Sequence, residues 1–205
     1  MPTIANMSKV NGIVISGAPA VPDAHVLIAT ATASSSATLS FTLGLDSLYD
    51  AYEFRFVNMH PAASGEWFFQ VNSSGGSGFN ETITSTHFRA YVIETDASNN
   101  GVGYRTAADQ AQGTGYQQLS QSTAGGSGFD DASVCGVLTL YAPSSTTYVK
   151  HFTSRAQSMG GSPVSVDAFA AGYINTTSAI DEISFKFDSG NIDAGEIKMY
   201  GVAKS

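Results

Sequence analysis

Apolar and polar side chains alternate with a period of two along most of this 205-residue chain. In the segment AYEFRFVNMH, Tyr52, Phe54 and Phe56 fall on one side of an extended backbone, while Glu53 and Arg55 fall on the other. Such a period is typical of a β-strand with one buried face, because successive side chains point to opposite faces of a sheet. The alternation therefore predicts a protein built mainly of strands.

The same pattern, rich in β-branched and aromatic residues between Gly, Asn, Asp, Ser and Pro, predicts about ten strands. VLIATAT and ATLSFT are expected to form a pair of strands. In THFRAYVIET the alternation is centred on Phe88, Ala90 and Val92, which are expected to form the apolar face of that strand. The strands are expected at residues 26–32, 37–42, 51–60, 66–72, 86–95, 133–142, 146–156, 167–176, 179–188 and 195–203.

Strands that follow one another without intervening helices exclude a parallel α/β sheet. Residues 104–115 have no apolar helical face and are expected to form a short turn or a loop, and residues 43–50 have room for one helical turn. The predicted fold class is all-β. We expect an antiparallel β-sandwich, jelly-roll-like because several connections are too long for simple hairpins.

The chain is expected to form a single β-sandwich domain over residues 23–205, preceded by an extended N-terminal arm over residues 1–22. The arm is predicted from SGAPAVPDA, which has two prolines and mostly small residues. A segment of this kind is expected to dock on a neighbouring chain. The N-terminal sequence has no continuous apolar stretch of the secretory type, and no run of 18 apolar residues predicts a membrane-spanning helix.

The pentapeptide GGSGF occurs twice, at residues 75–79 and 125–129. The flanking residues of the two copies do not align, so a tandem repeat is not indicated. Neither copy is followed by the lysine and helix of a phosphate-binding loop. Both are predicted to be turns in which glycine supplies positive φ, after which Phe79 and Phe129 re-enter the core.

Charge is sparse and its balance is acidic. Only 13% of the residues are charged, and 9 Lys and Arg against 17 Asp and Glu give a net charge of −8. The basic residues are scattered singly, which argues against nucleic acid and against an anionic membrane surface as partners. A surface with so few charges does little to prevent association, so it suits a protein that packs against copies of itself or other proteins.

No group of residues has the spacing of a catalytic, cofactor-binding or metal site, so no such residue and no cofactor is predicted. The single cysteine, Cys135, lies in an alternating apolar run and is expected to be a small buried side chain. DSGNID at 188–193 loosely resembles a calcium loop, but it lacks the glutamate of a full ligand set, and a hairpin turn explains it equally well. Asp130–Asp131 is a weaker acidic candidate. Four histidines lack ligand spacing: His25, His60, His87 and His151.

Aromatic side chains leave two interpretations open. Exposed rings can stack on sugars, or they can fill a core or a subunit interface, where Tyr and Trp are common. We favour the second interpretation. Without a G-x-S-x-G motif or a selected pair of carboxylates, the protein is not expected to be an enzyme. The aromatic candidates are Tyr104, Tyr116, Tyr148, Tyr173 and Trp67.

Four longer stretches form an ordered series: LYDAYEFRFVNMHPA (48–62), FQVNSSGGSGFNETITSTHFRAY (69–91), LTLYAPSSTTYVKHFTSRA (138–156) and AGYINTTSAIDEISFKFDSGNIDAGEIKMYGV (171–202). In this order they resemble a family of small virion-associated structural proteins of tailed bacteriophages, of the marine phage type. The resemblance covers about residues 25–202. Members are mostly described as structural or tail-related, so the resemblance implies neither catalytic residues nor a fixed position on the particle.

The expected function is that of a non-enzymatic bacteriophage virion structural protein on the outer surface of the particle, as a capsid decoration (cement) protein or a head fibre. Its expected partners are other virion proteins, either major capsid or tail proteins, and its own copies in a homotrimer. Assembly is expected in the reducing host cytoplasm, where a chain without disulfides folds normally. The alternative is a tail-fibre or receptor-binding module that recognises a host surface glycan, and a carbohydrate-active enzyme is a third hypothesis.

Overall fold

The computed structural model describes residues 8–10, 13–15 and 25–202. Most of the predicted arm, residues 1–22, lies outside the described residues, as do both ends of the predicted domain. Within the arm, β1 (Ser8–Val10) pairs antiparallel with β2 (Ile13–Ile15). The docking role of the arm stays a prediction.

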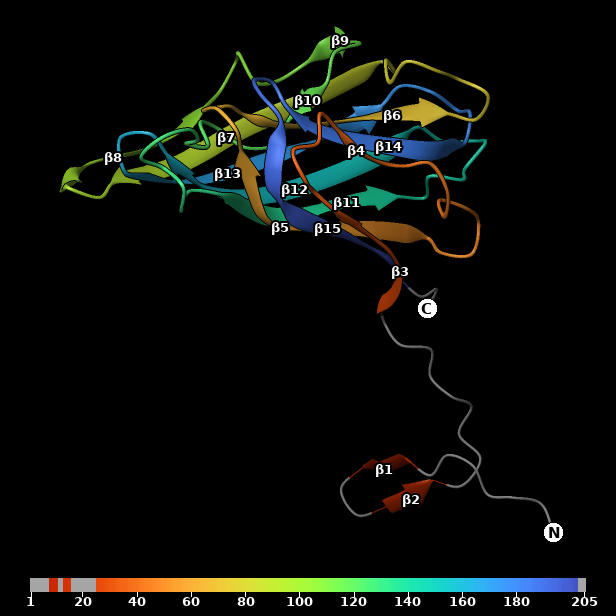
Figure 1. The fold of residues 1–205 in the computed structure, drawn as a ribbon. Coiled ribbons are helices and arrows are strands. Elements are labelled where there is room, and N and C mark those ends of the chain that lie inside the picture. The colour runs from red at the N-terminus through yellow and green to blue at the C-terminus, as the bar shows by residue number, and fades with distance from the viewer. Residues whose placement is uncertain (1–7, 11–12, 16–24, 203–205) are drawn as a thin grey trace.

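Residues 25–202 form two packed antiparallel sheets, which confirms the predicted β-sandwich (Figure 1). The larger sheet has nine strands in the order β3-β15-β5-β11-β12-β13-β7-β8, with β9 beside β7. The smaller has four, in the order β10-β6-β14-β4. The large sheet consists of β3 (His25–Thr32), β5 (Ala51–Pro61), β7 (Ile83–Ile93), β8 (Asp96–Tyr104), β9 (Ala111–Gly113), β11 (Val134–Tyr141), β12 (Lys150–Gly160), β13 (Val164–Ile174) and β15 (Ile192–Val202). The small sheet consists of β4 (Leu39–Phe41), β6 (Trp67–Ser73), β10 (Gln117–Gln118) and β14 (Ile180–Phe187).

The connections repeatedly cross from one sheet to the other, as in a jelly-roll. Each strand of the small sheet is entered from the large sheet and left toward it again. For this reason the predicted pairing of residues 26–32 with 37–42 is wrong: β3 pairs with β15 in the large sheet, whereas β4 pairs with β14 in the small one. Residues 43–50 hold bends rather than a helical turn, and no helix that could span a membrane occurs among the described residues.

Aromatic rings from both sheets meet in the core. Phe54 and Phe56 of β5 are fully buried, as predicted from the alternation, and so is Trp67 of β6. Phe54 contacts Phe185 of β14 with ring centroids 5.6 Å apart, and Phe56 contacts Trp67 at 6.1 Å. These contacts bury large apolar surfaces, which is the main stabilising term of a sandwich of this size.

The face predicted for the strand at 86–95 is inverted. Phe88 and Val92 of β7 are 44% and 38% exposed, and it is His87 that is fully buried. Alternation fixes which residues share a face of a strand, but not which face meets the core. Phe88 and Val92 of β7 point away from the small sheet, whereas His87 and Ser85 point toward it on the same face as the buried Ile83.

Both GGSGF segments are turns, as predicted. Gly75 and Gly78 in the first copy, and Gly126 and Gly128 in the second, have positive φ angles between 79° and 92°. The expectation that the following phenylalanines re-enter the core is wrong, because Phe79 and Phe129 are only half-buried. Phe79 itself has a positive φ of 50°, so it belongs to the turn rather than to the next strand.

Candidate interaction surface

One broad surface of the molecule is built by strands and not by loops: the face of the large sheet that points away from the small sheet. We call it the outer face. It consists of the side chains that alternate with the buried residues of β3, β15, β5, β11, β12, β13 and β7, and of their register partners in β8. In β12, for instance, Phe152, Ser154 and Ala156 are buried, so His151, Thr153 and Arg155 lie on the outer face.

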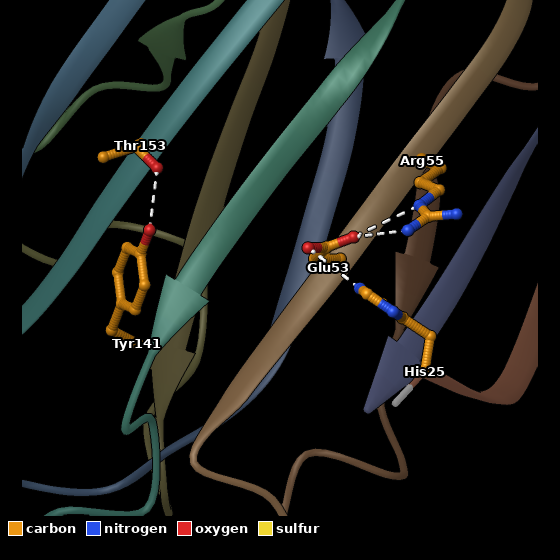
Figure 2. Close-up of polar contacts among 5 residues, drawn as sticks. All are labelled: His25, Glu53, Arg55, Tyr141 and Thr153. Atoms are coloured by element: carbon orange, nitrogen blue, oxygen red, sulfur yellow. Dashed lines mark hydrogen bonds and ion pairs between the residues drawn. The ribbon is translucent and has the colours of Figure 1, made fainter. Parts of the chain in front are cut away.

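The charges on one half of the outer face are joined in a network (Figure 2). Arg55 donates to the carboxylate of Glu53 through Nε and Nη2, at 3.1 and 2.9 Å, and His25 Nε2 lies 3.2 Å from the other Glu53 oxygen. The guanidinium of Arg55 also lies 4.8 Å from the ring centre of Tyr200. Although partial burial opposes the shift, the hydrogen bonds from Arg55 and His25 hold the pKa of Glu53 below its usual value.

A second ion pair lies on the other half of the face. Arg155 of β12 donates to both carboxylate oxygens of Asp167 on β13, at 3.0 and 2.7 Å. Its guanidinium lies 5.1 Å from the ring centre of Phe169, which stacks in turn on Phe88 with ring planes 6° apart. Lys198 and Glu196 form a third pair on β15. These three pairs join three cations of the outer face to three anions, and Glu94, exposed next to Val92, is a further anion of this surface.

Exposed apolar side chains are concentrated on the same face. Ten large hydrophobic residues are exposed in the described part of the chain, and seven of them lie on the outer face: Leu27, Val57, Phe88, Val92, Val102, Tyr104 and Tyr141. The other three, Leu43, Leu48 and Tyr148, are in connecting segments. Exposed apolar residues that cluster on one face indicate an interaction surface, whereas scattered ones are ordinary.

The relief of the outer face is shallow. Depressions of about 410, 430 and 450 Å³ lie over the small residues Ala171 and Gly172, beside Met159, and over Gly136. On the core side of Gly136 an added Cβ would lie 2.3 Å from the Arg155 carbonyl oxygen and 2.8 Å from the buried Phe56 ring, so β11 has no side chain at this position. Shallow, mostly apolar hollows of this kind accept protruding side chains of another protein and do not enclose a small molecule.

The predicted histidine and cysteine candidates are scattered. His25 and His151 lie on the outer face, His60 Nδ1 is 2.6 Å from the carbonyl oxygen of Ala132, and His87 is in the interior. Cys135 is half-buried on the outer face, not fully buried as predicted, and the Asn58 N–H approaches its sulfur at 3.2 Å. Among the described residues, no three His, Cys, Asp or Glu side chains gather as metal ligands.

The side chains of the loop DSGNID form hydrogen bonds with the backbone of distant segments. Asp188 of DSGNID accepts the Glu66 N–H at 2.8 Å, and Asn191 donates to the Ser35 carbonyl at 3.1 Å. The interpretation of this loop as a hairpin turn is wrong, since β14 and β15 lie in different sheets and the loop crosses between them. Asp130 and Asp131 line a separate depression of about 310 Å³ beside His60.

The aromatic candidates do not form one platform. Trp67 is fully buried in the core, and Tyr148 is 73% exposed in a connecting segment. The Tyr116 ring is covered by Lys186, whose Nζ lies 4.5 Å from the ring centre. Only Tyr104 and Tyr173 lie on the outer face, at β8 and β13.

The sequence did not predict a buried polar layer beneath β7. The Ser85 hydroxyl donates to the Gln117 side chain at 2.6 Å, and Gln117 donates to the Ala108 carbonyl at 2.9 Å. Beside them His87 is fully buried, and neither ring nitrogen has a hydrogen-bond partner among the described groups. These contacts tie the segment before β10 to the large sheet, so the layer serves the fold.

The ion pairs of the outer face were not predicted either, although the sequence contains one signal for the pair Arg155–Asp167. Residues 160–163 read Gly-Gly-Ser-Pro, a turn sequence, and a hairpin closed there places Arg155 near Asp167.

Comparisons with protein-family models, with curated proteins and with solved structures find no match to this chain.

Proposed function

We propose that this protein is a non-enzymatic structural component of a tailed-phage virion, which assembles on the outside of the particle through its outer face. Capsid decoration or a head fibre is the proposed placement, with other virion proteins and further copies of the chain as partners. The observation that carries the proposal is a broad sheet face of an acidic protein, on which most of the exposed large apolar side chains lie and three cations are paired with anions. The resemblance of residues 25–202 to virion-associated proteins supplies the setting.

Neutrality matters because identical copies of an acidic protein repel each other. Each copy carries −8, and two such copies approach with less electrostatic cost through a surface on which most charges are paired than through one with many unpaired carboxylates. On the outer face three cations are already paired with anions, as in Arg155–Asp167 and Arg55–Glu53. Burying paired charges costs less than burying single ones, since each keeps its hydrogen-bond partner.

The proposed face is tested by placing one unpaired anion in its middle. Thr139 of β11 lies on the outer face, directly opposite Glu53 on one side and Thr153 on the other. Thr139→Glu is expected to weaken self-association at least about tenfold, because the new carboxylate faces Glu53 and must be desolvated without a partner. Sedimentation equilibrium measures the effect and also the predicted homotrimer.

The matched control is Leu48→Glu, which adds the same charge at a side chain that is 68% exposed in the segment before β5. It is expected to leave the association constant within about twofold of wild type. If both variants associate as the wild type does, or if the wild type stays monomeric at high concentration, assembly through this face is refuted. Cryo-electron microscopy of particles carrying either variant reads incorporation directly.

A second candidate function is recognition of a host glycan. One observation favours it: Tyr173, His151 and three threonines line the depression over Ala171 and Gly172. A ring that stacks on a sugar, together with hydroxyl groups, is a common way to bind a neutral saccharide. Tyr173→Ala is expected to abolish any binding seen on a glycan array, and an array on which the wild type binds nothing would exclude this candidate.

A further inference from the structure

The strand β8 is an open edge of the large sheet. It pairs with β7 on one side, and no strand within residues 25–202 pairs with its other side. Eight of its nine residues are exposed, including Val102 at 79% and Tyr104 at 54%. In Figure 1, β7 and β8 reach beyond the small sheet at one end of the sandwich, so both faces of β8 are left uncovered.

This edge lacks the features that usually protect an edge strand. Proteins guard such edges with lysine, proline or a bulge, because unpaired N–H and C=O groups are a template for another strand. β8 contains no Lys, Arg or Pro, and its one charged residue, Asp96, accepts the Ser98 N–H at 3.0 Å at the start of the strand. The register shift opposite Val92 and Ile93 confines the irregularity to that same start. The stretch Asn100–Tyr104 is therefore regular, uncharged and open.

We propose that β8 pairs antiparallel with β8 of a second copy, across a two-fold axis at Val102, so that two large sheets become continuous. Asn100 then lies opposite Tyr104 of the second copy, and Gly101 lies opposite Gly103. The two Val102 side chains meet at the axis. This contact deepens the proposed assembly role and rests on it only for the identity of the partner as another copy of the chain.

The residues of this stretch suit a second copy better than an arbitrary peptide. An isologous contact places the same surface on both sides, so any charge in it would face its own kind. Here the paired stretch has no charge, and Asp96 falls beyond its end. Gly101 and Gly103 carry no side chain to hinder the approach, and Val102 shares the outer face with Ala90, its register partner on β7. The opposite edge strand, β3, directly follows residues outside the described part, so its edge supports no equal argument.

The contact is small, so cross-linking tests it better than affinity does. In a Cys135→Ser background, Val102→Cys places the two thiols at the axis, within disulfide range of each other. Mild oxidation is expected to give a covalent dimer at least about tenfold faster than with Leu48→Cys, at a position away from the edge that is 68% exposed against 79% for Val102. Equal rates for the two variants would overturn the β8 contact.

A charge at the axis gives an independent measurement. Val102→Lys sets two ammonium groups against each other and is expected to weaken the edge contact about tenfold, whereas Val102→Thr keeps strand propensity and is expected to change it little. Adding Thr139→Glu to the cysteine variant separates the two proposals. If cross-linking persists while face assembly is lost, the edge contact stands alone; if assembly persists in Val102→Lys and Val102→Cys does not cross-link, only the outer face is used.

Discussion

Replacing Trp67 by alanine is expected to lower the free energy of unfolding by about 3–5 kcal/mol, the range for the largest buried aromatic side chains. Trp67 is fully buried at the centre of the aromatic cluster. Its ring stacks on Phe185 with planes 12° apart and lies 4.8 Å from the ring centre of Phe187. Removing it deletes the transfer free energy of the indole and leaves a cavity between two sheets that are held in place by their other strands.

The measurement is urea unfolding followed by circular dichroism, because Trp67 is the only tryptophan and its fluorescence disappears with it. Trp67→Phe is the informative companion. The indole Nε1 is buried without a hydrogen-bond partner in the described part of the chain, so phenylalanine loses volume but also removes an unsatisfied donor. We expect a loss of about 1 kcal/mol for Trp67→Phe, and no more than about 0.5 kcal/mol for the exposed Tyr148→Ala. An alanine variant as stable as the phenylalanine variant would contradict this account of the core.

The sequence was enough to predict the fold class because period two is a local signal. The spacing of Tyr52, Phe54 and Phe56 alone indicates a half-buried strand, and all three side chains are buried in the structure. Pairing is not local. β4 does not pair with the preceding strand β3 but with β14, which is more than a hundred residues away. This pairing is determined by the requirement to cover the core side of the large sheet. The sequence of a short strand such as Leu39–Phe41 does not indicate which strand it pairs with.

The inversion of β7 shows the same limit at the level of side chains. Phe88 was expected on the core face because it is apolar, and His87 on the other face because it is polar. In the structure Phe88 stacks on Phe169 of the neighbouring strand, and His87 joins the polar layer built by Ser85 and Gln117. Both choices satisfy alternation, and only partners from distant strands distinguish them. The proposed interaction surface could not be predicted for this reason: it consists of cross-strand neighbours whose registers appear only in the folded sheet.

His87 leads to the second large prediction, a loss of stability in acid of about 3 kcal/mol from this one side chain. Its imidazole is fully buried, and the nearby charged groups are Arg105, Arg89 and Asp109. Burial, reinforced by the two guanidinium groups, lowers the pKa of His87 from 6.5 to about 4, and Asp109 opposes the shift only in part. The folded protein therefore keeps this histidine neutral at a pH where the unfolded chain is already protonated.

The direction of this pH dependence follows from the number of protons that His87 binds in the folded and in the unfolded state. Above pH 6.5 both states are neutral at His87 and the residue makes no difference. As the pH falls from 6.5 to about 4, only the unfolded state gains a proton, so stability decreases throughout this interval and the loss is complete below it. Urea unfolding at pH 7, 5.5 and 4 is expected to show a steeper decline for wild type than for His87→Leu, which cannot take up the proton. His151→Gln, at an exposed histidine, is the control and is expected to follow the wild type. If the stability of wild type and of His87→Leu falls in parallel with pH, His87 is solvated or paired in the folded protein, and the prediction of a neutral buried histidine is wrong.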